Sequence, residues 1–190
     1  RLALGRLSSS AFRKTFQTVP SPIVIFATLF HDIGKPPTRR LVREHKGRRV
    51  HFWGHEVRGA VLARSIAERL RLASYRSSIP TDDFVWLIRH HLVITTSDPL
   101  ALRPSTLARY CTGQRGTLLL QLAWADQSAS IHPNGKAATE HFRSARRRLR
   151  ALFRKSKTDY VLPPVLMTGK TLIQQFGMRE GPAIGRILQK

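Results

Sequence analysis

Residues 22–36 read PIVIFATLFHDIGKP, and this segment decides the fold class. Ser21 followed by proline is typical of a helix start, so the largely apolar run 23–30 is predicted to be a buried helix. The helix should end at the His-Asp pair, because Gly34 favours a stop and Pro36 cannot continue it. A membrane span needs about 20 apolar residues. This run is far shorter, which argues against a transmembrane protein.

The rest of the chain continues as one helix after another. Apolar residues recur at helical spacing, whereas few segments alternate with the period of a strand. Residues 38–51 are expected to form a basic loop. The predicted fold class is therefore all-α. The further helices are expected at 54–72, 81–91, 104–110, 116–130 and 137–155.

Three regions are expected along the chain. Residues 1–20 form a basic N-terminal arm, 21–158 the main helical domain, and 159–190 a small helical C-terminal unit after Pro163-Pro164. The Arg- and Ser-rich start has the composition of an organellar presequence, but an ordinary basic arm is the preferred interpretation.

Charge is the dominant feature of the composition. Lys and Arg total 33 against 11 Asp and Glu, for a net charge of +22. Such a surface favours polyanions, with nucleic acid ahead of anionic membrane, because no basic helix carries a row of large apolar anchors. The densest cations, which are the predicted nucleic-acid contacts, are Arg39, Arg40, Arg43, Arg48, Arg49, Arg143, Arg146, Arg147, Arg148, Arg150, Arg154 and Lys155.

Cysteine usage bears on the compartment. Cys111 has no partner within the chain, which excludes a disulfide scaffold and fits a reducing compartment such as the cytoplasm or an organelle matrix. A lone cysteine is more often a buried apolar residue than a nucleophile.

Histidine and aspartate recur at the ends of the predicted helices. Imidazole together with carboxylate suits divalent metals of borderline hardness. Each residue taken alone is more often an ordinary core or capping residue, so the hypothesis rests on the set. The candidate ligands are His31, Asp32, His55, His90, His91 and Asp126.

Several strings in this order resemble one family. ATLFHDIGKP, FWGHEVRGAVLARSIAERLRL, LIRHHL and ADQSA resemble the HD domain of the CCA-adding enzyme and poly(A) polymerase family, and LMTGKTLIQQFGMREGPAIGRIL resembles its C-terminal unit. The resemblance implies an HD-domain helical bundle with a small helical C-terminal appendage. It also implies one or two divalent ions (Mn, Fe, Ni, Zn or Mg), which would lower the pKa of a bound water and polarise a phosphoryl oxygen.

The resemblance also assigns roles. His31-Asp32 would be the family's ligand pair, Asp126 the late ligand, and His55 with either His90 or His91 the optional ligands of two-metal members. His31, Asp32 and Lys35 are the predicted catalytic residues, Lys35 balancing phosphate charge.

Two departures from the family pattern stand out. Residues 1–30 contain no upstream His, and the nucleotidyltransferase head is absent, so this chain is not expected to add CCA or poly(A) by itself.

Three functions stay open from the sequence. The chain is a metal-dependent phosphohydrolase (a phosphatase or phosphodiesterase) acting on nucleotide or RNA phosphoesters; or a non-catalytic RNA-binding module; or a structural part of a larger polymerase. The RNA-binding module would be the tRNA-binding body of a split CCA-adding enzyme, working with a separate nucleotidyltransferase subunit, or a subunit of a ribonucleoprotein such as an organellar ribosome. RNA, either tRNA or rRNA, is the expected partner of the first two.

Overall fold

The computed structural model describes residues 2–45, 47–74, 79–95, 102–131, 135, 137–155, 169–179, 181, 183, 184 and 188. The chain forms two compact units, Arg1–Tyr160 and Val161–Lys190. The elements of the first unit are α1 (Leu2–Leu7), α2 (Ser10–Phe16), α3 (Pro22–Phe30), α4 (Lys35–Thr38), β1 (Arg40–Glu44), β2 (Gly47–His51), α5 (His55–Arg69), η1 (Leu72–Ser74), α6 (Thr81–His90), α7 (Leu92–Thr95), α8 (Pro104–Cys111), α9 (Gly113–Ala129) and α10 (Glu140–Lys155). In the second unit the structure describes α11 (Gly169–Phe176).

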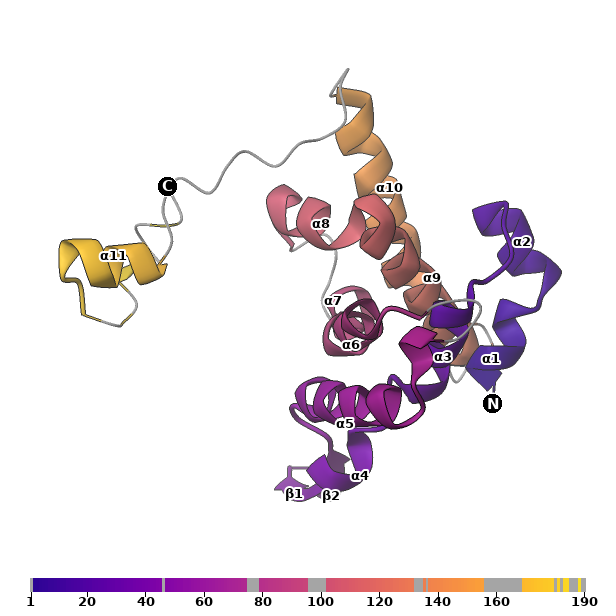
Figure 1. Ribbon diagram of the computed structural model, residues 1–190, viewed down its shortest axis with the longest axis horizontal. Coiled ribbons are helices and arrows are strands. Elements are labelled where there is room, and N and C mark those ends of the chain that lie inside the picture. Colours follow the sequence, from indigo (N-terminus) through magenta and orange to yellow (C-terminus); the bar gives the residue numbers. More distant parts are fainter. Residues whose placement is uncertain are drawn as a thin grey trace. The chain divides into compact units, whose positions relative to one another are not determined.

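Helix α9 is the central element of the first unit. It packs against α1, α3, α6, α7, α8 and α10 (Figure 1). Its Leu119, Leu122, Ala123 and Ala125 are almost wholly buried, as expected for a helix that is apolar around most of its circumference. The all-α prediction is confirmed, and each helix predicted from residue spacing between 22 and 155 corresponds to a helix in the structure.

The N-terminal segment contributes to the core. Residues 1–20 were expected to be a basic arm, yet they contain α1 and α2, whose Leu7 and Phe12 are fully buried. The Phe12 ring meets Trp124 of α9 edge-on, with centroids 5.5 Å apart. Leu4, Leu7, Phe12 and Phe16 therefore pack on the bundle, while Arg6, Arg13 and Lys14 are exposed.

The basic loop predicted at 38–51 is a β-hairpin. β1 and β2 pair antiparallel, with Val42 opposite Arg49 and Arg43 opposite Arg48. Gly47 has φ +116°, a conformation that favours glycine, at the start of β2. The strands alternate too weakly for their period to stand out in the sequence, because both are mostly exposed.

The one cysteine, Cys111, is buried, as predicted. Burial raises the pKa of its thiol to about 12, so it is not a reactive thiolate at neutral pH.

Among the described residues, no helix is both long and apolar enough to cross a membrane.

A close approach of two glycines sets the spacing between the His-Asp turn and α5. A Cβ on Gly34 would lie 2.6 Å from the backbone nitrogen of Gly59 and would also collide with the His55 carbonyl. Gly59 faces Gly34 in turn, with its own Cβ position 3.4 Å from the Gly34 nitrogen. The missing side chains allow His55 to lie beside Asp32.

We expect Gly34→Ala to destabilise the fold by about 2–3 kcal/mol, because two backbones would have to separate. This loss corresponds to a fall in Tm of about 4–12 °C for a chain of this size. Gly5→Ala is the matched control: its Cβ would meet nothing within 4 Å, and alanine favours the helix. Thermal unfolding followed by circular dichroism compares the two, and an equal Tm for both variants would contradict the close-packing argument.

Candidate metal centre

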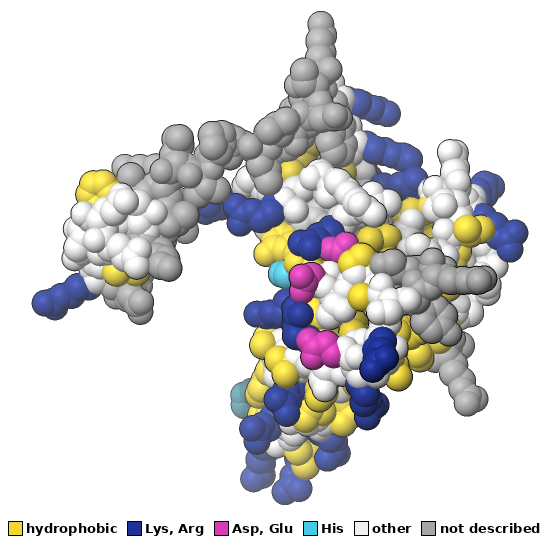
Figure 2. Space-filling model, in the orientation of Figure 1, with side chains coloured by type: hydrophobic (Ala, Val, Ile, Leu, Met, Phe, Trp, Pro, Cys, Tyr) yellow, Lys and Arg dark blue, Asp and Glu magenta, His cyan; other side chains and the backbone are white. Residues whose placement is uncertain are grey.

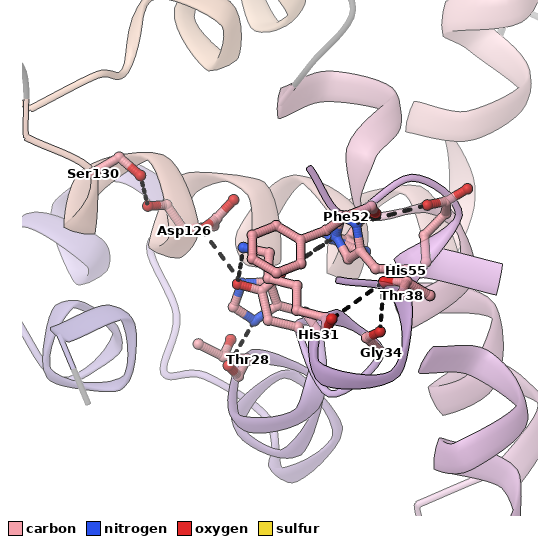
Figure 3. Close-up of polar contacts among 12 residues, drawn as sticks. Thr28, His31, Gly34, Thr38, Phe52, His55, Asp126 and Ser130 are labelled. Carbon is pink, nitrogen blue, oxygen red and sulfur yellow. Dashed lines mark hydrogen bonds and ion pairs between the residues drawn. The ribbon is translucent and has the colours of Figure 1, made fainter. Parts of the chain in front are cut away.

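Four helix ends meet at one point in the first unit. His31 directly follows α3, His55 begins α5, His91 directly follows α6, and Asp126 lies in the last turn of α9. Figure 3 shows His31, His55 and Asp126 turned toward a common centre. The chain thus brings together residues separated by up to 95 positions.

All three histidines are oriented in the same way. The Nδ1 atoms of His31, His55 and His91 lie 2.7–2.9 Å from the backbone carbonyls of the residues three positions earlier in the chain. A carbonyl can only accept, so each Nδ1 carries the hydrogen and donates it. In the neutral ring Nε2 is then a bare acceptor, which is the tautomer that binds a metal ion through Nε2.

The bare nitrogens converge on Asp32. Its Oδ1 lies 3.4 Å from Nε2 of His55 and 3.9 Å from Nε2 of His91. The two Nε2 atoms lie 3.2 Å from each other, although two lone pairs cannot form a hydrogen bond. Asp32, His55 and His91 therefore present three acceptors to one small volume, an arrangement that a cation would stabilise.

The spacing fits a divalent ion. Two imidazole nitrogens bound at about 2.0–2.1 Å to one ion lie about 2.8–3.4 Å apart at angles between about 90° and the tetrahedral angle. The 3.2 Å between His55 and His91 falls in this range. The donor set of two imidazoles and one carboxylate suits Mn, Fe, Ni or Zn.

His31 joins a second carboxylate to this cluster. Its Nε2 lies 3.4 Å from both Asp32 Oδ2 and Asp126 Oδ1. Burial acts to lower the pKa of His31, but the Asp126 hydrogen bond and the Asp32 charge outweigh it, and the pKa is raised. Burial likewise disfavours the Asp32 carboxylate, yet His31 and the Lys35 ammonium keep the pKa of Asp32 below its ordinary value.

The adjacent residues His90 and His91 lie in different surroundings. Burial lowers the pKa of His91 to about 4, so its ring is neutral and able to bind a metal at neutral pH. His90 instead lies against Trp86 and Tyr110, with centroids 4.7 and 5.1 Å away, and its Nδ1 meets the Trp86 carbonyl. Of the alternatives left open by the sequence, His91 is the one in the cluster.

A pocket of about 480 Å³ is lined by Asp32, His55, His91 and Asp126. Lys35 lines it, and its Nζ lies 2.6 Å from Asp32 Oδ2. Sequence reasoning missed two further lining residues, Glu140 and His141 of α10. His141 is held by its Nδ1, 3.0 Å from the Thr95 carbonyl. No sequence signal reveals that the start of a basic helix faces the site.

The predicted nucleic-acid contacts fall on two surfaces. Arg39, Arg40, Arg43, Arg48 and Arg49 are exposed on or beside the hairpin, and Arg143, Arg147, Arg150 and Arg154 are exposed on α10. Arg148 is half-buried, and the Lys155 side chain lies outside the described residues. Arg146 makes an internal contact, because its Nη2 donates to the Thr15 carbonyl at 2.7 Å.

We expect the metal-free protein to lose stability as the pH falls from about 6.5 to about 4. His91 takes up its proton at pH 6.5 when unfolded but only near 4 when folded, so acid favours the unfolded state by up to about 3 kcal/mol. His31, whose pKa is raised, acts in the opposite sense near pH 6.5, where its unfolded ring is still partly deprotonated, and so offsets part of the loss at the top of this window. Urea unfolding in EDTA at both pH values measures the loss.

The matched variants for this test are His91→Gln and His90→Gln. His91→Gln should remove most of the pH dependence of the free energy of unfolding, and His90→Gln should keep most of it. The same slope in the wild type and in His91→Gln would show that another group is responsible.

Comparisons with known proteins identify two curated relatives of similar sequence. The A-adding tRNA nucleotidyltransferase of Deinococcus radiodurans is 30% identical over 168 residues, covering 86% of this chain and 35% of that protein. The CC-adding tRNA nucleotidyltransferase of Thermus thermophilus is 28% identical over 163 residues, covering 86% and 33%. The chain spans about a third of the length of these curated relatives, and the resemblance predicted from its motifs is confirmed.

A family model described as "HD domain" matches residues 13–113, which hold the His-Asp pair, His55 and His91. Since this match covers more than half of a chain whose helices gather those residues around Asp32, the chain belongs to the HD domain family.

Proposed function

We propose that this chain is a metal-dependent phosphohydrolase acting on nucleotide or RNA phosphoesters. The observation that carries the proposal is the convergence of two bare imidazole nitrogens and Asp32 Oδ1 at the mouth of a pocket. A divalent ion bound there would lower the pKa of a water ligand and polarise a phosphoryl oxygen.

The residues around the cluster suit a phosphoester. Lys35 borders the pocket and would neutralise part of the phosphate charge, while its bond to Asp32 Oδ2 leaves Oδ1 turned toward His55 and His91. His31 would hold Asp126 and Asp32 in a fixed relation. His31, Asp32 and Lys35 are thus the proposed catalytic residues, and Asp126 is a further proposed ligand.

The hairpin supports RNA as the substrate class. Arg43 lies directly opposite Arg48, and like charges in this position destabilise a hairpin unless an anion lies alongside. Figure 2 shows Lys and Arg gathered at the end of the first unit where β1 and β2 lie. Trp53 follows β2, is 65% exposed and stacks on His51, so it offers a surface on which a base could stack.

A second candidate function is a non-catalytic RNA-binding body of a tRNA nucleotidyltransferase. It is favoured by the two relatives, both named as tRNA nucleotidyltransferases and both aligned to 86% of this chain. Under this proposal the same basic surfaces bind tRNA, and a nucleotidyltransferase head supplies the chemistry. The two candidates differ in whether the chain by itself turns over a phosphoester.

Metal content tests the cluster. We expect the purified protein to hold about one Mn, Fe, Ni or Zn per chain, and His91→Asn to lose it, because one of the converging nitrogens disappears. His90→Asn is the neighbouring control and should keep the metal, since His90 lies against Trp86 and Tyr110. Elemental analysis by mass spectrometry measures the metal bound per chain. Equal metal content in both variants would refute the assignment of His91 as a metal ligand.

Turnover tests the hydrolase. We expect the metal-loaded protein to release phosphate from p-nitrophenyl phosphate or to open 2′,3′-cyclic AMP. Asp32→Asn should lower kcat/KM by at least about a hundredfold, since it removes the charge that all three histidines face. A protein that holds stoichiometric metal, binds tRNA and turns over neither compound would favour the second candidate.

A further inference from the structure

A second concave site lies on the first unit, distinct from the metal pocket. It is a groove of about 1020 Å³ between α1–α2 and α10. Arg6, Ser9 and Thr15 line it from the N-terminal helices, and the arginines of α10 line it from the other side. The N-terminal residues were not among those that sequence reasoning linked to a ligand.

The α10 wall is a regular row of guanidinium groups. Arg143, Arg147, Arg150 and Arg154 lie at spacings of four, three and four residues, so they recur once per turn along one face over about 16 Å. All four are exposed, and within the described part of the chain no ion pair joins them to a carboxylate. Like charges one turn apart destabilise a helix, so the row favours a bound polyanion.

The floor of the groove is held firmly. Phe16 of α2 packs between Trp124 and Phe142, with ring centroids 6.2 and 5.9 Å away. Arg146 crosses from α10 to donate to the Thr15 carbonyl, and its guanidinium lies over the Phe16 ring. Burial and the charge of Arg150 lower the pKa of Arg146, as expected for a cation used inside the fold. The two walls are therefore fixed before any ligand arrives.

The groove ends beside the metal pocket. Glu140, the first residue of α10, lines both cavities. Ser128 lines the groove and its neighbour Gln127 lines the pocket, where Gln127 Oε1 also accepts from the Phe142 amide. A strand lying along the arginine row would thus reach the pocket rim at the start of α10.

We infer that this groove binds the phosphate backbone of a single RNA strand and directs its end toward the metal pocket. The evenly spaced guanidiniums match a repeating phosphate chain. Trp124 and Phe142 are buried in the floor, so the contacts are to the backbone and the binding is independent of base sequence. The choice of RNA rests on the proposed function, whereas the binding of a polyphosphate strand does not.

The test compares two triple variants with the same change in charge. Arg143→Gln/Arg147→Gln/Arg150→Gln removes the row, and Arg58→Gln/Arg69→Gln/Arg109→Gln removes three exposed arginines outside the groove. The probe is a fluorescein-labelled, unstructured RNA of about twelve nucleotides, a length within the range of single-strand binding sites. Anisotropy is measured in EDTA over a series of salt concentrations, so that no hydrolysis occurs.

We expect the groove variant to bind at least about tenfold more weakly, with the slope of log K against log[salt] reduced by about 2 for three lost phosphate contacts. The control variant should bind within about twofold of the wild type. Equal losses in both variants would overturn the inference, because the effect would then come from net charge alone. Unchanged binding in the groove variant would overturn it as well.

Hydrolysis assays separate this inference from the proposed function. If the protein hydrolyses RNA ends, the groove variant should raise KM for RNA while leaving turnover of p-nitrophenyl phosphate unchanged. An equal fall in both activities would contradict the role of the groove in directing the strand. A protein that hydrolyses neither substrate but loses RNA affinity in the groove variant would retain the binding groove and refute the phosphohydrolase.

Discussion

The candidate site depends on one repeated local interaction, the hydrogen bond from a histidine Nδ1 to the backbone carbonyl three residues earlier. It occurs at His31, His55 and His91, each at a helix end. Carbonyls at helix ends and in turns lack intrahelical partners, so each can hold a ring in place at little cost to the helix. Because all three rings are held through Nδ1, their Nε2 atoms are left for the carboxylates: those of His55 and His91 face Asp32, and that of His31 lies between Asp32 and Asp126. The fold has only to bring the helix ends together, which it does through α9 and through the contact of Gly34 with Gly59.

Asp32 divides the cluster into two sides. Its Oδ1 faces the bare nitrogens of His55 and His91, whereas Oδ2 faces the Lys35 ammonium and His31. The side with His31 and Asp126 therefore already has a cation in Lys35, and His31 has a raised pKa. No lysine or arginine pairs with Asp32 Oδ1 on the side with His55 and His91 in the described part of the chain, and the low pKa of His91 keeps its ring neutral at neutral pH. A single divalent ion would therefore be better placed beside His55 and His91 than among His31, Asp32 and Asp126.

The sequence predicts the parts of this structure that depend on local spacing. Apolar periodicity locates α3, α5, α6, α9 and α10, because a helix face repeats within a few residues. The resemblance identifies four candidate ligands that meet at the site, His31, Asp32, His55 and Asp126, and leaves His90 and His91 as alternatives. Local spacing does not distinguish His90 from His91, since the difference is a rotation of about 100° about α6 that only the packing of Trp86 and Tyr110 fixes. It misses His141 and the internal role of Arg146 for the same reason: both contacts join segments more than 40 residues apart. The hairpin is hidden because its exposed strands lack a clear alternation.

The charge distribution affects both proposed ligands, a divalent metal ion and an RNA phosphate chain. A chain with a net charge of +22 repels divalent cations at long range, yet three of its 11 acidic residues, Asp32, Asp126 and Glu140, line a single small pocket. Screening limits the general repulsion to about 10 Å at 0.1 M salt, so these close carboxylates dominate the potential inside the pocket. Outside it, the hairpin and the α10 row present arginines. A phosphate chain is therefore attracted along the arginines, but inside the pocket three carboxylates face one lysine, Lys35, and would repel it unless a divalent cation were bound there. For the proposed hydrolase, metal would therefore bind before a phosphoester enters the pocket, whereas RNA held on the arginines alone would not require the metal.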